Sequence, residues 1–284
     1  MNLDGEPVYV GRDCGGQSLA LDRAVVDHYM RSVDDHSALY EEYVPGLVLH
    51  SECYRDLSWY LRNIFGNLHA RQEWELYHAV PVGTRVETRS FIRERYRKRG
   101  RDYVVKETWT LDGDGRLVTR GLTHQSFLVE DEEVDRSKDV VGKDTEKRSK
   151  PKVDISAGDG PLLEPVHKTV DEQMCMLFSG PGKNYHNDKQ EARNLGFPDI
   201  VVQGMLPICI VSELLTREFG TGWLAGGKMD VRLVNVLWGG ESIRATGRIR
   251  EETPEEDRTR VHLNVWAEKD DGTKVIIGQA SALR

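Results

Sequence analysis

Cysteine is scarce in this sequence, and its placement excludes two classes of site. The 284 residues include four cysteines, Cys14, Cys53, Cys175 and Cys209, and no two of them form a Cys-x-x-Cys pair. A zinc site or a disulfide framework would need closely or regularly spaced cysteines. Scattered cysteines suit a reducing compartment, so the sequence predicts a cytoplasmic protein without a metal site.

Long apolar runs and an excess of basic residues are also missing. No hydrophobic stretch is long enough to cross a bilayer, and the first residues lack the basic and apolar regions of a secretory signal. The formal net charge of −8 argues against general nucleic-acid binding. Hydrophobic residues make up 38% of the chain and charged residues 30%, as in globular proteins. We therefore expect neither a membrane nor a nucleic-acid partner.

The chain contains two copies of one pattern, in which a helix is followed by about four strands. When the first copy is shifted by 157 positions, the strand regions align without gaps. The matched pairs are Gly83 with Gly240, Trp109 with Trp266, Asp114-Gly115 with Asp271-Gly272, Val118 with Val275, and Gly121 with Gly278. Glycines mark turns and each tryptophan stands within a strand, so these matches fall where a shared backbone fixes the residue type.

A charged segment separates the two copies. Residues 130–160 are dominated by acidic and basic side chains and contain almost no large apolar residue, so they are predicted to form a linker. The predicted domains are therefore 1–129 and 161–284. An antiparallel sheet with one apolar face needs a helix to cover it, and two such units can join their sheets at an edge. The predicted fold class is α+β, a double hotdog that forms a pseudo-dimer.

The individual elements follow from the spacing of apolar residues. Helical spacing predicts helices over 19–31, 51–65 and 205–219, and a further helix for which Thr169 is the N-cap. Strand-like stretches separated by glycine turns fill 73–128 and the end of the chain.

The stretch 178–205 carries the candidate chemistry. A loop broken by glycine and proline places His186 between Asn184 and Asp188, and Gly204 precedes a strongly apolar helix. A histidine can move a proton near neutral pH, and the free N–H groups of a helix start can hold a developing oxyanion. The pairing predicts acyl chemistry, with His186 as the acid/base and the Gly204 N–H as the oxyanion donor.

This stretch resembles the motif of the MaoC-like dehydratases, the hotdog-fold (R)-specific enoyl-CoA hydratases. The matching positions are Ser179-Gly180, His186, Asp188, Ala192, Gly196-Phe197 and Gly204-Met205. The first copy is similar to the degenerate N-terminal unit of the two-unit members of that family. The resemblance implies a lyase of fatty acid metabolism that reversibly hydrates a 2-enoyl thioester to a 3-hydroxyacyl thioester. It implies no cofactor, with coenzyme A entering as part of the substrate.

The motif departs from the family where the chemistry is concentrated. Pro181 stands in place of the catalytic Asp of the family, and Gln203 in place of the His before the helix glycine. We expect Asn184 to orient the water or to hold the loop backbone, and Asp188 to fix the imidazole tautomer. Asp35, from the equivalent loop of the first copy, is a more distant substitute for the carboxylate.

Further substrate contacts are predicted at Lys183, Gln203, Ser212, Arg97 and Arg99. The two arginines belong to the basic run 93–101, where alternate side chains share a strand face and could hold the coenzyme A phosphates. Each prediction has a plainer alternative. Lys183 would be a solvated loop residue, Gln203 would cap the helix, and Ser212 would bond to the helix backbone. The two arginines would belong to a solvated hairpin.

Three functions remain open on the sequence alone. The first is an enoyl-CoA hydratase or 3-hydroxyacyl-CoA dehydratase. The second, supported by Pro181, is a non-catalytic hotdog protein that binds an acyl thioester or completes a partner's site. The third is a hotdog thioesterase, which the His loop disfavours because those enzymes rely on a carboxylate carried by the helix. The predicted partner is an acyl-CoA or acyl-carrier-protein thioester, and the predicted assembly is a homodimer or a higher homo-oligomer.

Overall fold

The structure, a computed structural model, describes residues 2–3, 6–48, 68–128, 140–142 and 155–284. The helix predicted over 51–65 and most of the predicted linker lie outside these residues. Strand β9 (Val140–Gly142), which lies inside the predicted linker, pairs in parallel with β6.

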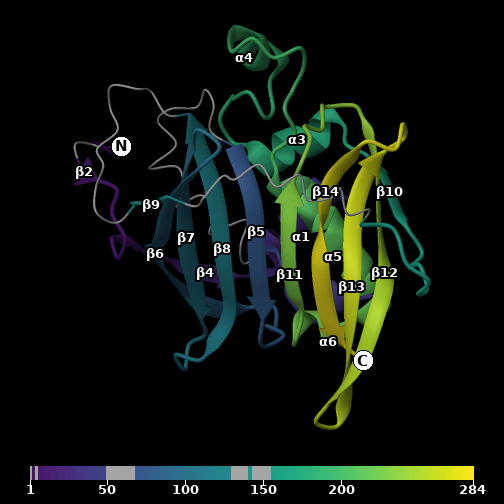
Figure 1. The fold of residues 1–284 in the computed structure, drawn as a ribbon. Coiled ribbons are helices and arrows are strands. Elements are labelled where there is room, and N and C mark those ends of the chain that lie inside the picture. The colour runs from purple at the N-terminus through teal and green to yellow at the C-terminus, as the bar shows by residue number, and fades with distance from the viewer. Residues whose placement is uncertain (1, 4–5, 49–67, 129–139, 143–154) are drawn as a thin grey trace.

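One long sheet runs through both copies of the repeat, and Figure 1 shows its two parts side by side. In the first copy its strands are β4 (Ser18–Leu21), β5 (Leu68–Leu76), β6 (Thr84–Lys98), β7 (Arg101–Leu111) and β8 (Leu117–Leu128). In the second copy they are β10 (Val166–Thr169), β11 (Lys228–Leu233), β12 (Ser242–Glu255), β13 (Arg258–Lys269) and β14 (Lys274–Leu283). Short strands β1 (Asn2–Leu3) and β2 (Glu6–Pro7) form a separate two-stranded sheet. Strand β3 (Asp13–Gly15) pairs antiparallel with β6.

The two copies meet where β5 pairs antiparallel with β11. The strand order is β10-β12-β13-β14-β11 in one half and β5-β8-β7-β6 in the other, so the order reverses across this seam. A two-pronged ion pair crosses it, with Arg71 Nε 2.6 Å from Asp230 Oδ1 and Arg71 Nη2 2.7 Å from Asp230 Oδ2. The seam therefore combines backbone pairing with a charge-assisted contact.

The strand ladders confirm the predicted repeat residue by residue. Arg89 lies opposite Trp109, and the positions 157 residues later, Thr246 and Trp266, are paired in the same way. The irregularity in the β6–β7 pairing falls between Ile92 and Glu94, and that in β12–β13 falls between Ile249 and Glu251. The two irregularities are therefore 157 positions apart, as the repeat predicts. The turn glycines Gly83 and Gly240 both have positive φ, 92° and 88°, which explains why glycine stands at both places.

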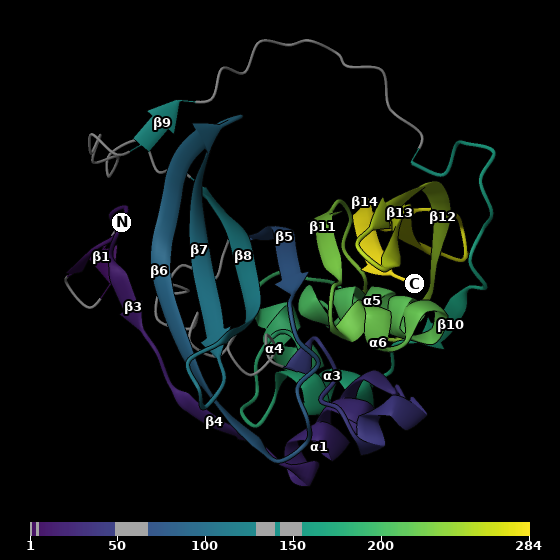
Figure 2. The same ribbon diagram turned by 90° about the horizontal axis from the view of Figure 1, so that it is seen from below.

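Helix α5 (Met205–Phe219) is the centre of the second half, and β11 to β14 curve around it (Figure 2). Thirteen of its fifteen residues are buried, which fits an apolar sequence with little preference for one face. Helix α6 (Thr221–Leu224) follows it directly. No helix in the described parts of the chain has the length and apolar content needed to span a membrane.

Two helix starts differ from the sequence predictions. The first helix, α1 (Arg23–Val33), begins four residues later than expected because Ser18–Leu21 pairs with β6. Asp22 then caps it by accepting from the Val25 N–H. Thr169 is not the N-cap of α3 (Glu172–Ser179), because it ends strand β10 and its hydroxyl bonds to that of Ser242.

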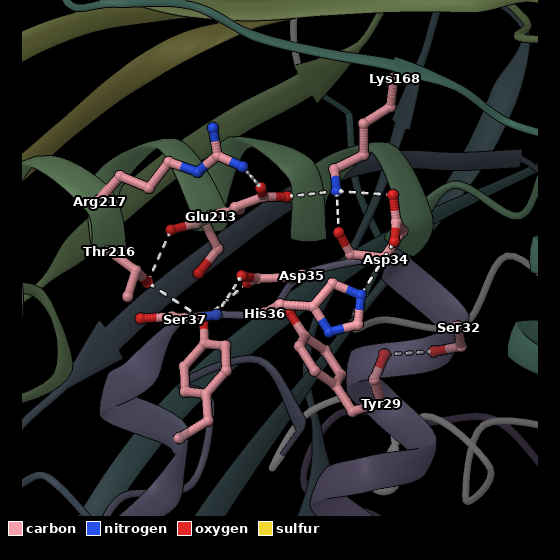
Figure 3. Close-up of polar contacts among 12 residues, drawn as sticks. Tyr29, Ser32, Asp34, Asp35, His36, Ser37, Lys168, Glu213, Thr216 and Arg217 are labelled. Atoms are coloured by element: carbon pink, nitrogen blue, oxygen red, sulfur yellow. Dashed lines mark hydrogen bonds and ion pairs between the residues drawn. The ribbon is translucent and has the colours of Figure 1, made fainter.

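A buried polar cluster joins α5 to the first half of the chain (Figure 3). Glu213 on α5 is fully buried, and its carboxylate contacts Arg217 and, at 3.0 Å, Lys168 Nζ from β10. The Lys168 ammonium also donates to the backbone carbonyl of Asp34, the residue that ends α1. Burial raises the pKa of Glu213. Since a buried charge is costly unless it is paired, this cluster ties α1, β10 and α5 together.

We predict that Glu213→Ala lowers the free energy of unfolding by about 3 kcal/mol, because the buried Lys168 would lose its nearer carboxylate and keep only Asp34 Oδ2 at 3.8 Å. Urea denaturation measures the change. Glu218→Ala is the matched control, since Glu218 lies on the same helix but pairs with Arg284 near the surface, where such pairs contribute about 1 kcal/mol or less. Equal effects of the two substitutions would show that the cluster is not stabilising.

Candidate active site

The loop 180–188 is held in shape by its own amide side chains. Asn184 Nδ2 donates to the carbonyl oxygens of Ser179 and Gly182, at 2.9 Å and 3.1 Å, and Asn184 Oδ1 accepts from the His186 backbone N–H at 2.8 Å. Asn187 adds a bond from its side chain to Gly182 O. Of the two roles expected for Asn184, these contacts fit the structural one. The residue holds the loop and places His186.

The charged residues of the loop contact each other and helix α4. Asp188 caps helix α4 (Lys189–Asn194) by accepting from the N–H groups of Gln190 and Glu191, and it pairs with Lys183 Nζ at 2.7 Å. The expectation that Asp188 fixes the imidazole tautomer is therefore wrong. The side chain of Lys183 is 80% exposed, so its position fits the solvated alternative.

His186 is fixed by the backbone instead. Its Nδ1 lies 2.7 Å from the carbonyl oxygen of Val201, so Nδ1 carries the proton and Nε2 keeps its lone pair. The centroid of its ring lies 3.9 Å from that of Tyr185, and Tyr185 also stacks with Phe197. Burial lowers the pKa of His186 to about 4, although the bond to Val201 opposes the shift. The imidazole is therefore neutral at pH 7 and available as a base.

The start of α5 is built differently from the starts of α1, α3 and α4. Each of those helices is capped by an aspartate, namely Asp22, Asp171 and Asp188. At α5 the capping position is Gly204, and among the described residues no side chain caps it. The first N–H groups of a helix have no acceptor within the helix and carry a partial positive charge. An aspartate cap would occupy them, whereas Gly204 has no side chain to do so.

A second histidine, which the sequence reasoning did not select, lies at this helix start. A Cβ added to Gly204 would stand 3.4 Å from His69 Nδ1 and 2.6 Å from Leu233 Cδ2. His69 belongs to β5, so the first half of the chain delivers it across the seam. The β5–β8 pairing is irregular between His69 and Arg71, a feature that re-aims side chains near functional sites. A lone histidine in a half with no catalytic motif gave no signal in the sequence.

The tautomer of His69 also follows from its neighbours. Gln72 Nε2 donates to the carbonyl oxygen of Glu73, so Gln72 Oε1 is the atom that lies 3.1 Å from His69 Nε2. Nε2 therefore donates to Gln72 Oε1, and Nδ1 is the ring nitrogen on the side of Gly204. Burial lowers the pKa of His69 to about 4. Each half thus contributes one neutral imidazole: His69 lies beside Gly204, and His186 bonds to the carbonyl of Val201, three residues before Gly204.

Asp35 is too far away to replace the missing carboxylate. It accepts from Tyr40 Oη at 2.7 Å, and Tyr40 Oη lies 3.5 Å from Thr216 Oγ1. Thr216 follows Gly204 by twelve positions, which corresponds to about 18 Å along a helix. Asp35 and Tyr40 are both 1% exposed. They occupy the other end of α5 and make no contact with His186.

The remaining predicted contacts are dispersed. Ser212 Oγ accepts from Trp223 Nε1 at 2.9 Å, which favours a packing role. Gln203 forms the turn before α5, where its carbonyl accepts from the Leu206 N–H. Arg97 pairs with Asp102, and Arg99 has a φ of 53° in the β6–β7 turn. The β6 bulge falls between Ile92 and Glu94 and so displaces Arg93 from the row, and Arg95 is buried with Nη1 donating to the Val8 carbonyl.

Within the described ranges, no three His, Cys, Asp or Glu side chains converge as metal ligands would. The site therefore consists of two imidazoles, a set of aromatic rings and the uncapped helix start.

Comparison by sequence finds no matching protein-family model and no matching curated protein. Solved structures do match. A MaoC-like dehydratase from Phytophthora capsici is 14% identical with a TM-score of 0.73, and the alignment covers 96% of this chain and 95% of that chain. A conserved hypothetical protein from Mycobacterium tuberculosis with a double hotdog fold is 13% identical with a TM-score of 0.67, over 99% and 96% of the two chains.

A third similar structure is the peroxisomal multifunctional enzyme type 2 of Drosophila melanogaster, at 15% identity and a TM-score of 0.65. The alignment covers 95% of this chain but 48% of that longer one. At these identities the likeness establishes the fold. The double hotdog predicted from the sequence is confirmed, and so is the resemblance to MaoC-like dehydratases at the level of the fold.

We predict that both imidazoles titrate with midpoints of about 4, because burial disfavours their charged forms. NMR of histidine-labelled protein measures the midpoints, and His69→Gln and His186→Gln assign the signals. Each imidazole binds fewer protons when folded than when unfolded, so each also lowers the stability as the pH falls from about 6.5 towards 4. Midpoints near 6.5 would mean that the two rings are solvated.

Proposed function

We propose that this protein is a hydratase/dehydratase that acts reversibly on a 2-enoyl thioester and its 3-hydroxyacyl counterpart. The observation that carries the proposal is the pairing of His186, neutral with a free Nε2 lone pair, with the uncapped start of α5. A base and an oxyanion donor are the two groups that addition of water to an enoyl thioester requires.

The hydration step can be written from these groups. The Nε2 atom of His186 takes a proton from water while the water oxygen bonds to the β-carbon. The electron pair of the double bond moves towards the thioester, and its oxygen becomes an enolate held by the N–H groups at Gly204. The imidazolium then returns the proton to the α-carbon as the enolate collapses. Dehydration is the reverse, and the fixed helix dipole needs no rearrangement as charge develops.

His69 takes over the place left by the family's carboxylate in this proposal. The side chain of Pro181 has no acceptor, Asn184 is engaged by the loop, and Asp35 lies at the far end of α5. A water that gives one proton to His186 has a second proton to place. The lone pair of His69 Nδ1 would accept it as a hydrogen bond and so orient the water. The reaction thus uses one imidazole from each half.

A thioesterase is less compatible with the arrangement of α5. The helix carries two carboxylates, Glu213 and Glu218. Glu213 is fully buried between Lys168 and Arg217, nine positions beyond Gly204, and Glu218 pairs with Arg284. Neither is placed to direct water to a thioester held at Gly204. A non-catalytic acyl-thioester binder would share the site but would not need neutral imidazoles.

We predict that the protein hydrates crotonyl-CoA and that His186→Ala lowers kcat/KM by about 10²-fold to 10⁴-fold, the usual contribution of a positioned acid/base. Loss of enoyl absorbance measures hydration, and a thiol reagent measures hydrolysis. His167→Ala, at an exposed position on β10, is the control and should leave the rate unchanged. Thiol release would indicate a thioesterase, and the absence of both signals would indicate a binder.

His69 is tested separately because its role is positioning water. We predict that His69→Ala lowers kcat at least tenfold with little change in KM, since thioester binding at Gly204 is retained. His69→Asn keeps a hydrogen-bonding side chain and should recover part of the loss. A purely structural role would instead lower the stability and leave kcat per folded molecule unchanged, which circular dichroism and active-site titration would reveal.

A further inference from the structure

A groove of about 240 Å³ crosses the sheet at the seam, on the face that points away from α5. Lys228 and Asp230 of β11 line it, and Met229 between them belongs to the core. Successive side chains of a strand point to opposite faces, so the groove opens on the outer face. Leu233, which lies beside Gly204, shares the inner face with Met229. The sheet therefore separates the groove from the proposed active site.

A row of ladder partners lines the groove. Glu75 lies opposite Lys228, Lys228 opposite Ser281, and Ser281 opposite His262. The row crosses β5, β11, β14 and β13, which stand in this order from left to right in Figure 1. Arg250 lines the groove from the bulge of β12, the next strand. Ser281 is a short residue between two long ones, so the surface is hollow at this point.

The carboxylates at the groove are already paired with cations. Asp230 accepts two hydrogen bonds from Arg71, and Glu73 Oε1 lies 3.2 Å from Arg71 Nη2. Glu75 Oε1 lies 3.8 Å from Arg120 Nη1. These three are the acidic side chains that line the groove. Their charge is therefore largely neutralised within the protein.

Two cations at the groove are not paired in this way. No hydrogen bond or ion pair joins Lys228 or Arg250 to another residue in the part of the chain that the structure describes. Glu255 interacts electrostatically with Lys228, but it is itself held by two hydrogen bonds from Arg260. The chain has a formal net charge of −8, so two unpaired cations at one groove favour an anionic ligand.

The floor of the groove supplies a hydrogen-bond donor. Ser281 is 6% exposed, and its Oγ accepts from Arg260 Nη1 at 3.1 Å. Arg260 also donates to the carbonyl oxygen of Gly226 at 2.9 Å, so its position is fixed. A serine hydroxyl has one proton and two lone pairs. Because Arg260 occupies a lone pair, the proton of Ser281 remains available to a ligand in the groove.

These features match the chemistry of a diphosphate. Ammonium and guanidinium groups bind phosphate oxygens through charge-assisted hydrogen bonds. Lys228 and Arg250 belong to strands three places apart, which corresponds to about 14 Å between their Cα atoms. Two linked anionic groups suit this spacing better than a single ion. The groove is smaller than the roughly 300–1,000 Å³ of sites for drug-sized ligands, so it suits a diphosphate group better than a whole nucleotide.

We propose that the outer face of the seam carries a second ligand site, in which Lys228, Arg250 and Ser281 bind a diphosphate group. The group could be inorganic diphosphate or the diphosphate part of a nucleotide such as ADP, which share this chemistry. The site does not depend on the hydratase reaction, because the groove and Gly204 lie on opposite faces of the sheet.

Calorimetric titration of the full-length protein with inorganic diphosphate tests the site. We expect one diphosphate per chain, bound at least tenfold more tightly than inorganic phosphate. Lys228→Met and Arg250→Met should each weaken diphosphate binding about tenfold, as for one hydrogen bond to a charged group. Arg232→Met is the matched control and should leave binding unchanged, because Arg232 is exposed on the same strand and face as Lys228 but does not line the groove.

A third variant avoids any change of charge. Ser281→Ala should weaken diphosphate binding about threefold, as for one neutral hydrogen bond, and thermal unfolding shows whether each variant is folded. ADP that binds as tightly as diphosphate would identify a nucleotide as the source of the group, and ADP that binds tenfold more weakly would identify inorganic diphosphate. No binding of diphosphate, or equal losses in Arg232→Met and Lys228→Met, would overturn the proposal.

NMR distinguishes the groove from the start of α5, whose uncapped N–H groups could also hold an anion. Diphosphate should shift the backbone amide signals of Ser281 and His262 and leave those of Gly204 and Met205 unchanged. Shifts confined to Gly204 and Met205 would place the anion at the helix start and overturn the proposal. Hydration of crotonyl-CoA is measured separately, so either site can fail without the other.

Discussion

The antiparallel pairing of β5 with β11 is the contact on which the rest of the molecule depends. It joins two half-sheets that have turns and bulges at equivalent positions, and the Arg71–Asp230 ion pair crosses it. Because β5 lies next to the half that contains α5, a residue at the beginning of β5 reaches the start of that helix. The seam thus turns two similar modules into one asymmetric site.

The asymmetry is chemical rather than architectural. The second half keeps an apolar inner face, an apolar central helix and a loop that holds His186. The first half shares its strand ladder but supplies His69 and a buried polar face that includes Lys106. In the proposed reaction the two copies divide the tasks, because the second would provide the oxyanion donor and the base, and the first would orient the water.

Sequence reasoning reached the fold because its signals are local and repeated. Glycines such as Gly83 and Gly240 predict turns, and the apolar run of α5 predicts a buried helix. His186 and Gly204 could also be selected from the sequence, because a motif surrounds them. His69 was not, since it becomes relevant only when β5 is placed beside β11. The expected role of Asp188 was wrong because capping α4 is the stronger local use of that aspartate.

A crystal structure with bound 3-hydroxybutyryl-CoA tests the central claim most directly. We expect the thioester oxygen to lie within about 3 Å of a backbone N–H at the start of α5. We also expect the 3-hydroxyl to lie between His186 Nε2 and His69 Nδ1. A thioester bound elsewhere, or a hydroxyl that contacts neither imidazole, would contradict it.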